Sequence, residues 1–121
     1  MATLTPRLTL RSNSSATDRL NVTISDTLVI TNPSVNIARQ SISTSAAFNV
    51  LTAADNTSIT YVYLKNVDKT NIITVKDDAG NNFLDLGPGE FTFLPVKGGI
   101  GLEVQANTAA CILEYGYWTK S

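Results

Sequence analysis

The chain has 121 residues, of which 43% are hydrophobic and 16% charged, with a formal net charge of −1. This size predicts one domain with enough apolar material for a buried core. The near balance of basic and acidic residues excludes the basic surface that phosphate backbones require, so we expect no direct nucleic-acid partner. The sequence contains no histidine, which removes the commonest general base and metal ligand. We therefore expect no enzymatic activity, no metal and no cofactor.

Neither export nor membrane insertion is indicated by the sequence. The first residues lack the apolar stretch of a signal peptide, and no segment approaches the ~20 apolar residues of a membrane span. We expect a protein made in the cytoplasm, without a membrane partner. The single cysteine, Cys111, lies in an apolar run at 109–113, which predicts a small buried hydrophobic side chain.

We divide the chain into an N-terminal arm at residues 1–19 and a domain at residues 20–121. Leu4, Leu8 and Leu10 lie among Thr, Arg and Ser residues, which is compatible with a short strand. Such a strand is weak alone and needs a neighbour, from its own domain or another chain, to complete a sheet. The alternative is a frayed terminus.

Beyond the arm, the first half of the domain consists of short alternating segments. Apolar and polar residues alternate over 20–25, an apolar run follows at 28–30, and Pro33 ends it. Weaker alternation continues over 35–45. The segment 58–66 gives the clearest strand pattern, with apolar side chains on both faces, so we expect it to be central in its sheet.

Turn residues divide the second half into further strands. A strand at 72–76 leads to a hairpin loop at 77–82, and the turns at Gly87-Pro88-Gly89 and Gly98-Gly99 separate the next apolar runs. The last strand, 110–119, places Tyr115 and Tyr117 on one side and Trp118 on the other.

Together these patterns give eight to ten short strands and no amphipathic helix. They predict an all-β protein with a single antiparallel β-sandwich domain, jelly-roll-like, and an N-terminal arm.

Two binding alternatives follow from side-chain chemistry. The loop at 77–82, together with Asp85, could supply oxygen ligands to calcium, although acidic hairpin tips are ordinarily solvated turns, and we assign no metal. The aromatic residues of 61–63 and 115–118 could stack on sugar rings, but their placement on strands also suits a core or a subunit interface.

Four segments resemble small virion structural proteins of tailed bacteriophages, in particular cyanophages and marine phages. Some of these proteins are capsid decoration, or cement, proteins. The segments are Y-V-Y-L-K-N at 61–66, F-T-F-L-P at 91–95, V-Q-A-N-T at 104–108 and E-Y-G-Y-W at 114–118. They lie within residues 58–119, about half of the chain, and none is diagnostic alone.

The resemblance implies a jelly-roll-like protein, often a homotrimer, that binds the outer surface of the assembled capsid and stabilises it through apolar and β-edge contacts. The major capsid protein is then the partner. We assign capsid binding to Leu4, Leu8 and Leu10 of the arm. We assign the subunit interface to Tyr115, Tyr117 and Trp118. The alternative is a tail fibre or receptor-binding β-sandwich that recognises cell-surface glycans, and an enzyme of jelly-roll fold is disfavoured by the missing histidines.

Overall fold

The computed structural model describes residues 2–12, 20–33 and 37–120, and its regular elements are all strands. The sequence patterns predicted eight to ten strands, whereas the described residues form twelve. Four of these twelve strands lie within residues 2–12 and 20–33. The strands are β1 (Ala2–Leu4), β2 (Arg7–Arg11), β3 (Asn21–Ser25), β4 (Leu28–Pro33), β5 (Ala38–Ile42), β6 (Phe48–Leu51), β7 (Thr60–Asn66), β8 (Ile73–Asp77), β9 (Asn82–Leu86), β10 (Phe91–Val96), β11 (Leu102–Ala106) and β12 (Cys111–Lys120).

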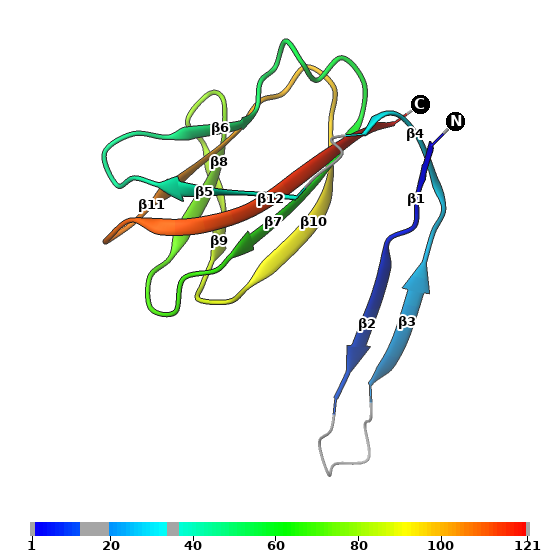
Figure 1. Ribbon diagram of the computed structural model, residues 1–121, viewed down its shortest axis with the longest axis horizontal. Coiled ribbons are helices and arrows are strands. Elements are labelled where there is room, and N and C mark those ends of the chain that lie inside the picture. The colour runs from blue at the N-terminus through cyan, green and yellow to red at the C-terminus, as the bar shows by residue number, and fades with distance from the viewer. Residues whose placement is uncertain (1, 13–19, 34–36, 121) are drawn as a thin grey trace.

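Two antiparallel sheets form the body of the molecule (Figure 1). The larger has the order β1-β4-β12-β7-β10, with β5 also paired to β12, and the smaller has the order β6-β11-β8-β9. The predicted all-β, sandwich-like architecture is confirmed. The central position predicted for the segment 58–66 is also confirmed, because β7 lies between β12 and β10.

The core lies between the two sheets and is almost entirely aliphatic. Along β7 the buried residues alternate with half-buried ones, as period-2 geometry requires. Each fully buried aliphatic side chain contributes about 1.5–3 kcal/mol to folding. Cys111 is buried here, as predicted. The cluster comprises Ile42, Val50, Leu51, Val62, Leu64, Ile73, Val75, Leu86, Val96, Leu102, Val104, Ala106, Cys111 and Leu113.

Glycine sets the geometry of the predicted tight turn between β9 and β10. Glu90 N–H donates to the carbonyl of Gly87 at 3.0 Å, and Gly89 has a φ of 75°. Proline at the second position and a left-handed residue at the third define a type II turn. This sharp reversal brings β10 back to pair with β7 at the free edge of the larger sheet.

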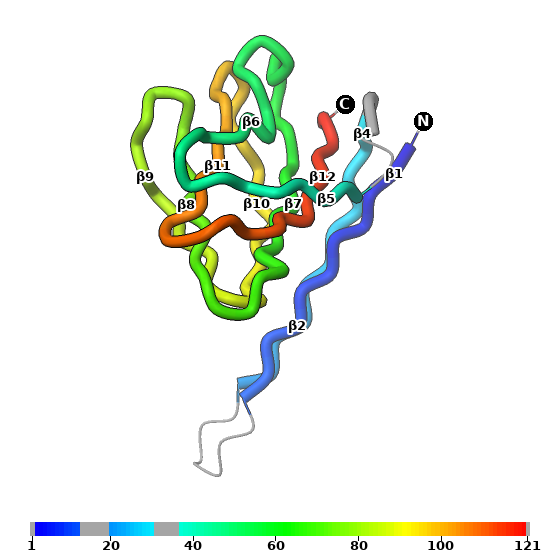
Figure 2. The backbone as a smooth tube through the Cα atoms, turned by 60° about the vertical axis from the view of Figure 1, so that its left-hand side comes forward, coloured from blue at the N-terminus to red at the C-terminus, as the bar shows by residue number. Residues whose placement is uncertain are grey.

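Residues 2–12 and 20–33 pair as antiparallel strands and extend away from the sandwich (Figures 1 and 2). We call these residues the arm. At its base β1 pairs with β4 inside the larger sheet, and beyond it β2 pairs with β3. The arm predicted from the sequence comprised residues 1–19, so Asn21–Ser25 was assigned to the domain; residues 13–19 lie outside the described part of the chain.

Two fully buried asparagines fasten the loops to the sandwich. The Asn56 amide donates to the carbonyls of Lys97 and Ile100 at 2.7 and 3.0 Å and accepts from the Thr60 hydroxyl at 2.8 Å. Asn66 plays the same part at the other end of β7. Its amide donates to the carbonyls at positions 71 and 86. Buried polar groups of this kind are costly when their partners are removed.

We predict that Asn56→Ala lowers the free energy of unfolding by about 1–3 kcal/mol or more, because the two carbonyls and the Thr60 hydroxyl lose their partners. Urea unfolding measures the change. Asn49→Ala, at an exposed position of β6, is the matched control, with an expected change within about 0.5 kcal/mol. Equal losses in the two variants would contradict the role assigned to Asn56.

Candidate interaction surface

The outer half of the arm has one apolar face and one polar face. Cross-strand pairing places Leu8 opposite Ile24 and Leu10 opposite Val22. The alternate pairs join Arg7 to Ser25, Thr9 to Thr23 and Arg11 to Asn21. Leu8, Leu10 and Ile24 are 42%, 46% and 57% exposed. An aliphatic strip therefore lies open on one side of a two-stranded ribbon.

The outer face of the larger sheet carries most of the exposed aromatic side chains. Phe91 and Phe93 of β10 lie beside Tyr63 of β7, and Trp118 of β12 pairs across from Tyr61. Phe91 is 63% exposed. Monomeric soluble proteins rarely leave a contiguous apolar patch of this kind without a function.

The outer face of the smaller sheet is mostly polar. Thr74 donates to Asp85 at 2.8 Å, and Lys76 donates to Gln105 at 2.7 Å, so hydrogen-bonded side chains run across the strands. Phe83, in the bulged segment of β9, is an exposed aromatic residue on this sheet. The two faces of the sandwich therefore differ in kind, and the aromatic one is the candidate interaction surface.

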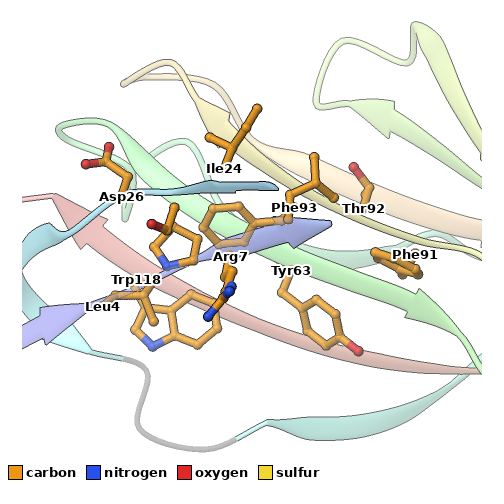
Figure 3. Close-up of a pocket in the computed structure, with 12 residues that line it drawn as sticks. Leu4, Arg7, Ile24, Asp26, Tyr63, Phe91, Thr92, Phe93 and Trp118 are labelled. Carbon is orange, nitrogen blue, oxygen red and sulfur yellow. The ribbon is translucent and has the colours of Figure 1, made fainter. Parts of the chain in front are cut away.

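A groove of about 650 Å³ separates the apolar side of the arm from the aromatic face (Figure 3). The wall formed by the arm includes Leu4, Leu8 and Ile24. The wall formed by the sheet includes Phe91, Phe93 and Trp118. The groove thus joins residues that are more than sixty positions apart in the sequence.

The aromatic wall is held by ring contacts. Tyr61 and Phe93 stack with centroids 5.9 Å apart, and Phe93 meets Trp118 at 6.4 Å with a tilt of 48°. Such aromatic pairs stabilise the fold by about 0.5–1.5 kcal/mol more than the burial of their apolar area alone would give. Gly116 makes room beside them, because a Cβ there would come within 2.9 Å of Ile37 Cδ1 and 3.2 Å of the Trp118 ring. The wall is therefore a fixed surface that side-chain rotation does not readily remove.

A polar cluster borders this wall. The Tyr63 hydroxyl donates to Glu114 Oε1 at 2.9 Å, and Arg39 contacts Glu114 Oε2 at 3.1 Å. Burial raises the pKa of Tyr63 to about 12, and the hydrogen bond to Glu114 adds to the shift. The hydrogen bonds from Tyr63 and Arg39 hold the pKa of Glu114 below its usual value. Arg39 is largely exposed, so the ion pair itself adds little stability.

The structure separates the residues that the sequence analysis assigned to the subunit interface. Trp118 faces the groove, whereas Tyr115 and Tyr117 pack against the core from the inner side of β12. Tyr115 meets Phe48 edge-on with centroids 5.6 Å apart.

The three residues assigned to capsid binding all lie in the arm. Leu4 and Leu8 line the groove, and Leu10 lies further along the same apolar strip. Their contact with a capsid remains a prediction.

Sequence reasoning missed the contribution of Ile24, Phe91 and Phe93 to this surface. The alternation of Phe91 and Phe93 with smaller residues was visible, but the pattern does not say which side of β10 faces the core. The sequence signal for Ile24 was its alternation over 20–25, which indicated a strand without indicating that its partner would be β2.

The acidic loop considered for calcium is held by its own hydrogen bonds. The Asp77 carboxylate accepts from the backbone N–H groups of Ala79 and Asn81 and from the Asn81 side chain. These bonds, chiefly those from Asn81, lower the pKa of Asp77. Within residues 2–12, 20–33 and 37–120, no group of three or more His, Cys, Asp or Glu side chains could hold a metal ion. The same residues include no helix that could span a membrane.

Comparisons with protein-family models, with curated protein sequences and with solved structures gave no match.

We predict that one tyrosine ionises near pH 12 and that stability falls as the pH rises from about 10 to about 12. The ordinary pKa of tyrosine is about 10. A group whose pKa is raised by folding stabilises the protein below its unfolded pKa, and that contribution is lost as the pH passes through the folded value. Tyrosinate absorbance and urea unfolding at several alkaline pH values measure the two effects.

Tyr63→Phe should remove the late ionisation. Glu114→Gln should lower the pKa of Tyr63, because the carboxylate that helps to raise it is gone. Glu103→Gln, on the smaller sheet, is the control and should leave it in place. A late ionisation that persists in Tyr63→Phe would show that another tyrosine is responsible.

Proposed function

We propose that this chain is a structural subunit of a tailed-phage virion, a decoration protein that binds the outside of the assembled head. The observation that carries the proposal is the arm, a two-stranded ribbon whose aliphatic side chains Leu8, Leu10 and Ile24 are open to solvent. An isolated hairpin is marginally stable in water. Its open apolar strip therefore suits an element that is completed by assembly.

The topology of the sandwich supports this proposal. Leaving the arm aside, the larger sheet has the order β5-β12-β7-β10 and the smaller sheet β6-β11-β8-β9. The first and last strands of this eight-stranded unit are neighbours, and most successive strands change sheet. We infer a jelly roll, an architecture built from two Greek keys that is common in viral capsid domains.

The difference between the two outer faces supports an orientation on the shell. The aromatic face and the arm turn toward neighbouring proteins, and the hydrogen-bonded polar face of the smaller sheet turns toward water. A protein that binds the assembled lattice and not the free subunit stabilises the lattice by mass action. The major capsid protein is the proposed partner, and the outer surface of the virion is the proposed location.

Counting the chain in intact particles of the virus that encodes it tests the proposal directly. Many copies distributed over the head, seen by quantitative mass spectrometry and antibody labelling, would support decoration. A small number at one end of the particle would indicate a tail protein. Absence from purified particles would overturn the proposal.

We predict that an arm-shortened variant folds but no longer coats the capsid. Residues 7–25 are replaced by Asn-Gly, a two-residue hairpin turn, because Asp26 N–H already donates to the Pro6 carbonyl at 3.2 Å. The β1–β4 pairing is retained, so the cooperative unfolding of the sandwich should persist. Cosedimentation with heads that lack the protein measures attachment, and wild-type attachment by this variant would contradict a role for the arm.

A second function, recognition of cell-surface glycans by a tail protein, is favoured by one observation. Trp118, Phe93 and Tyr61 form a partly exposed aromatic surface beside the polar cluster of Glu114 and Arg39, and sugar rings stack on such surfaces. Under the decoration proposal we predict no specific binding on a glycan array. Strong binding that is lost in Trp118→Ala and kept in Phe83→Ala would favour the tail protein.

A further inference from the structure

The arm presents an apolar surface that the described chain leaves uncovered. Leu10 and Val22 lie beyond Leu8 and Ile24 along the same face, and Leu10 is 46% exposed. The polar side chains of Thr9 and Thr23 occupy the opposite face. A strip of four aliphatic residues on a thin ribbon is stabilised only if another surface covers it.

The groove offers a surface of matching chemistry on the same chain. Phe91, Phe93 and Trp118 line its sheet side, and Phe91 is 63% exposed. Polar groups that could orient a small ligand are few, namely Arg7, Asp26 and the Tyr63 hydroxyl among the charged and phenolic residues. The hydroxyl is already bonded to Glu114. The surface is therefore better suited to aliphatic side chains than to a polar small molecule.

Charge favours an encounter between the arm of one copy and the body of another. The described arm residues include two arginines, Arg7 and Arg11, and one acidic residue, Asp26. Residues 37–120 hold six basic and eight acidic residues, a formal charge of −2. The arm is thus slightly positive and the sandwich slightly negative as a whole, and this difference favours their encounter at long range.

The dimensions also fit a reciprocal contact. Five residues of an extended strand span about 17 Å, and a two-stranded ribbon with its side chains is about 10 Å wide. If two copies exchange arms, two such patches are buried on both partners, which amounts to about 700 Å². This is the size of a weak interface, so the association should depend on concentration.

From these observations we propose that the groove of each copy receives the arm of a second copy. Leu8, Leu10, Val22 and Ile24 of one chain lie against Phe91, Phe93 and Trp118 of the other. Each copy gives one arm and accepts one, and when two copies exchange arms with each other the pair has twofold symmetry. This self-association can be tested without a shell. It uses the same arm residues as the decoration proposal, so attachment of the arm to a capsid requires that the arm leave the second copy.

The oligomeric state of the purified protein tests the proposal. Light scattering after size exclusion should give an oligomer for the wild type and a monomer for Ile24→Asp, with the population of associated chains falling at least tenfold. Thr23→Asp adds the same charge to the opposite face of the ribbon and should remain associated. A monomeric wild type, or equal dissociation of the two variants, would overturn the proposal.

Complementation tests the pairing of arm with groove. The arm-shortened variant loses the arm side of the groove but keeps the aromatic wall on the sheet, and Phe91→Asp keeps its arm but has a charged residue in that wall. Each should be monomeric alone, and the mixture should form a one-to-one complex. Phe83→Asp, at an exposed phenylalanine of the other sheet, should behave like the wild type. Failure of the mixture to associate would overturn the assignment of the groove as the site of the arm.

The single tryptophan of the chain, Trp118, lies in the groove and reports whether it is covered. Dilution of the wild type should shift the emission of Trp118 to longer wavelength as the arm of the second copy leaves. Ile24→Asp should show the long-wavelength emission at every concentration. Wild-type emission that stays at short wavelength and does not change with concentration would mean that each arm covers its own groove, and would overturn the proposal.

Discussion

The ten residues of β12 hold the two parts of this molecule together. On one side the strand pairs with β7 from Leu113 to Thr119. On the other side its first half pairs with β5 and its last residues pair with β4, which carries the arm. The base of the arm is therefore continuous with the central strands of the sandwich. A hairpin anchored in this way keeps its direction relative to the aromatic face, and the groove between them follows from that pairing.

Because β12 is shared, its two faces have different tasks. The inner face supplies Cys111 and Leu113 to the core, and burial raises the pKa of the Cys111 thiol, with a smaller contribution from Asp68. The outer face supplies Glu114 and Trp118 to the aromatic surface. A strand buried on both faces would read as continuously apolar. The mixed composition of β12 instead reflects one side committed to folding and the other available for contacts.

Local chemistry made much of the fold predictable, whereas the groove depends on long-range pairing. Pro88 followed by Gly89 favours a type II turn, and the apolar residues on both faces of 58–66 indicate a central strand. The alternation of side chains along a strand also placed Trp118 on the opposite side of the last strand from Tyr115 and Tyr117. It could not show which side would face the core, nor that Ile24 would pair with Leu8. Strand partners are chosen by the whole sheet, so the pairing of Asn21–Ser25 with β2 was not predicted and the residues of β10 were not assigned to a surface.

The loop that joins β8 to β9 offers a practical use of the polar sheet. Its backbone is fixed by Asp77, and Gly80 adopts the left-handed conformation with a φ of 89°. It belongs to the sheet that bears neither the arm nor the aromatic groove. A foreign peptide inserted beside Gly80 would project from the sheet opposite the groove, so this loop is suited to carrying an inserted peptide without disturbing the arm or the aromatic face.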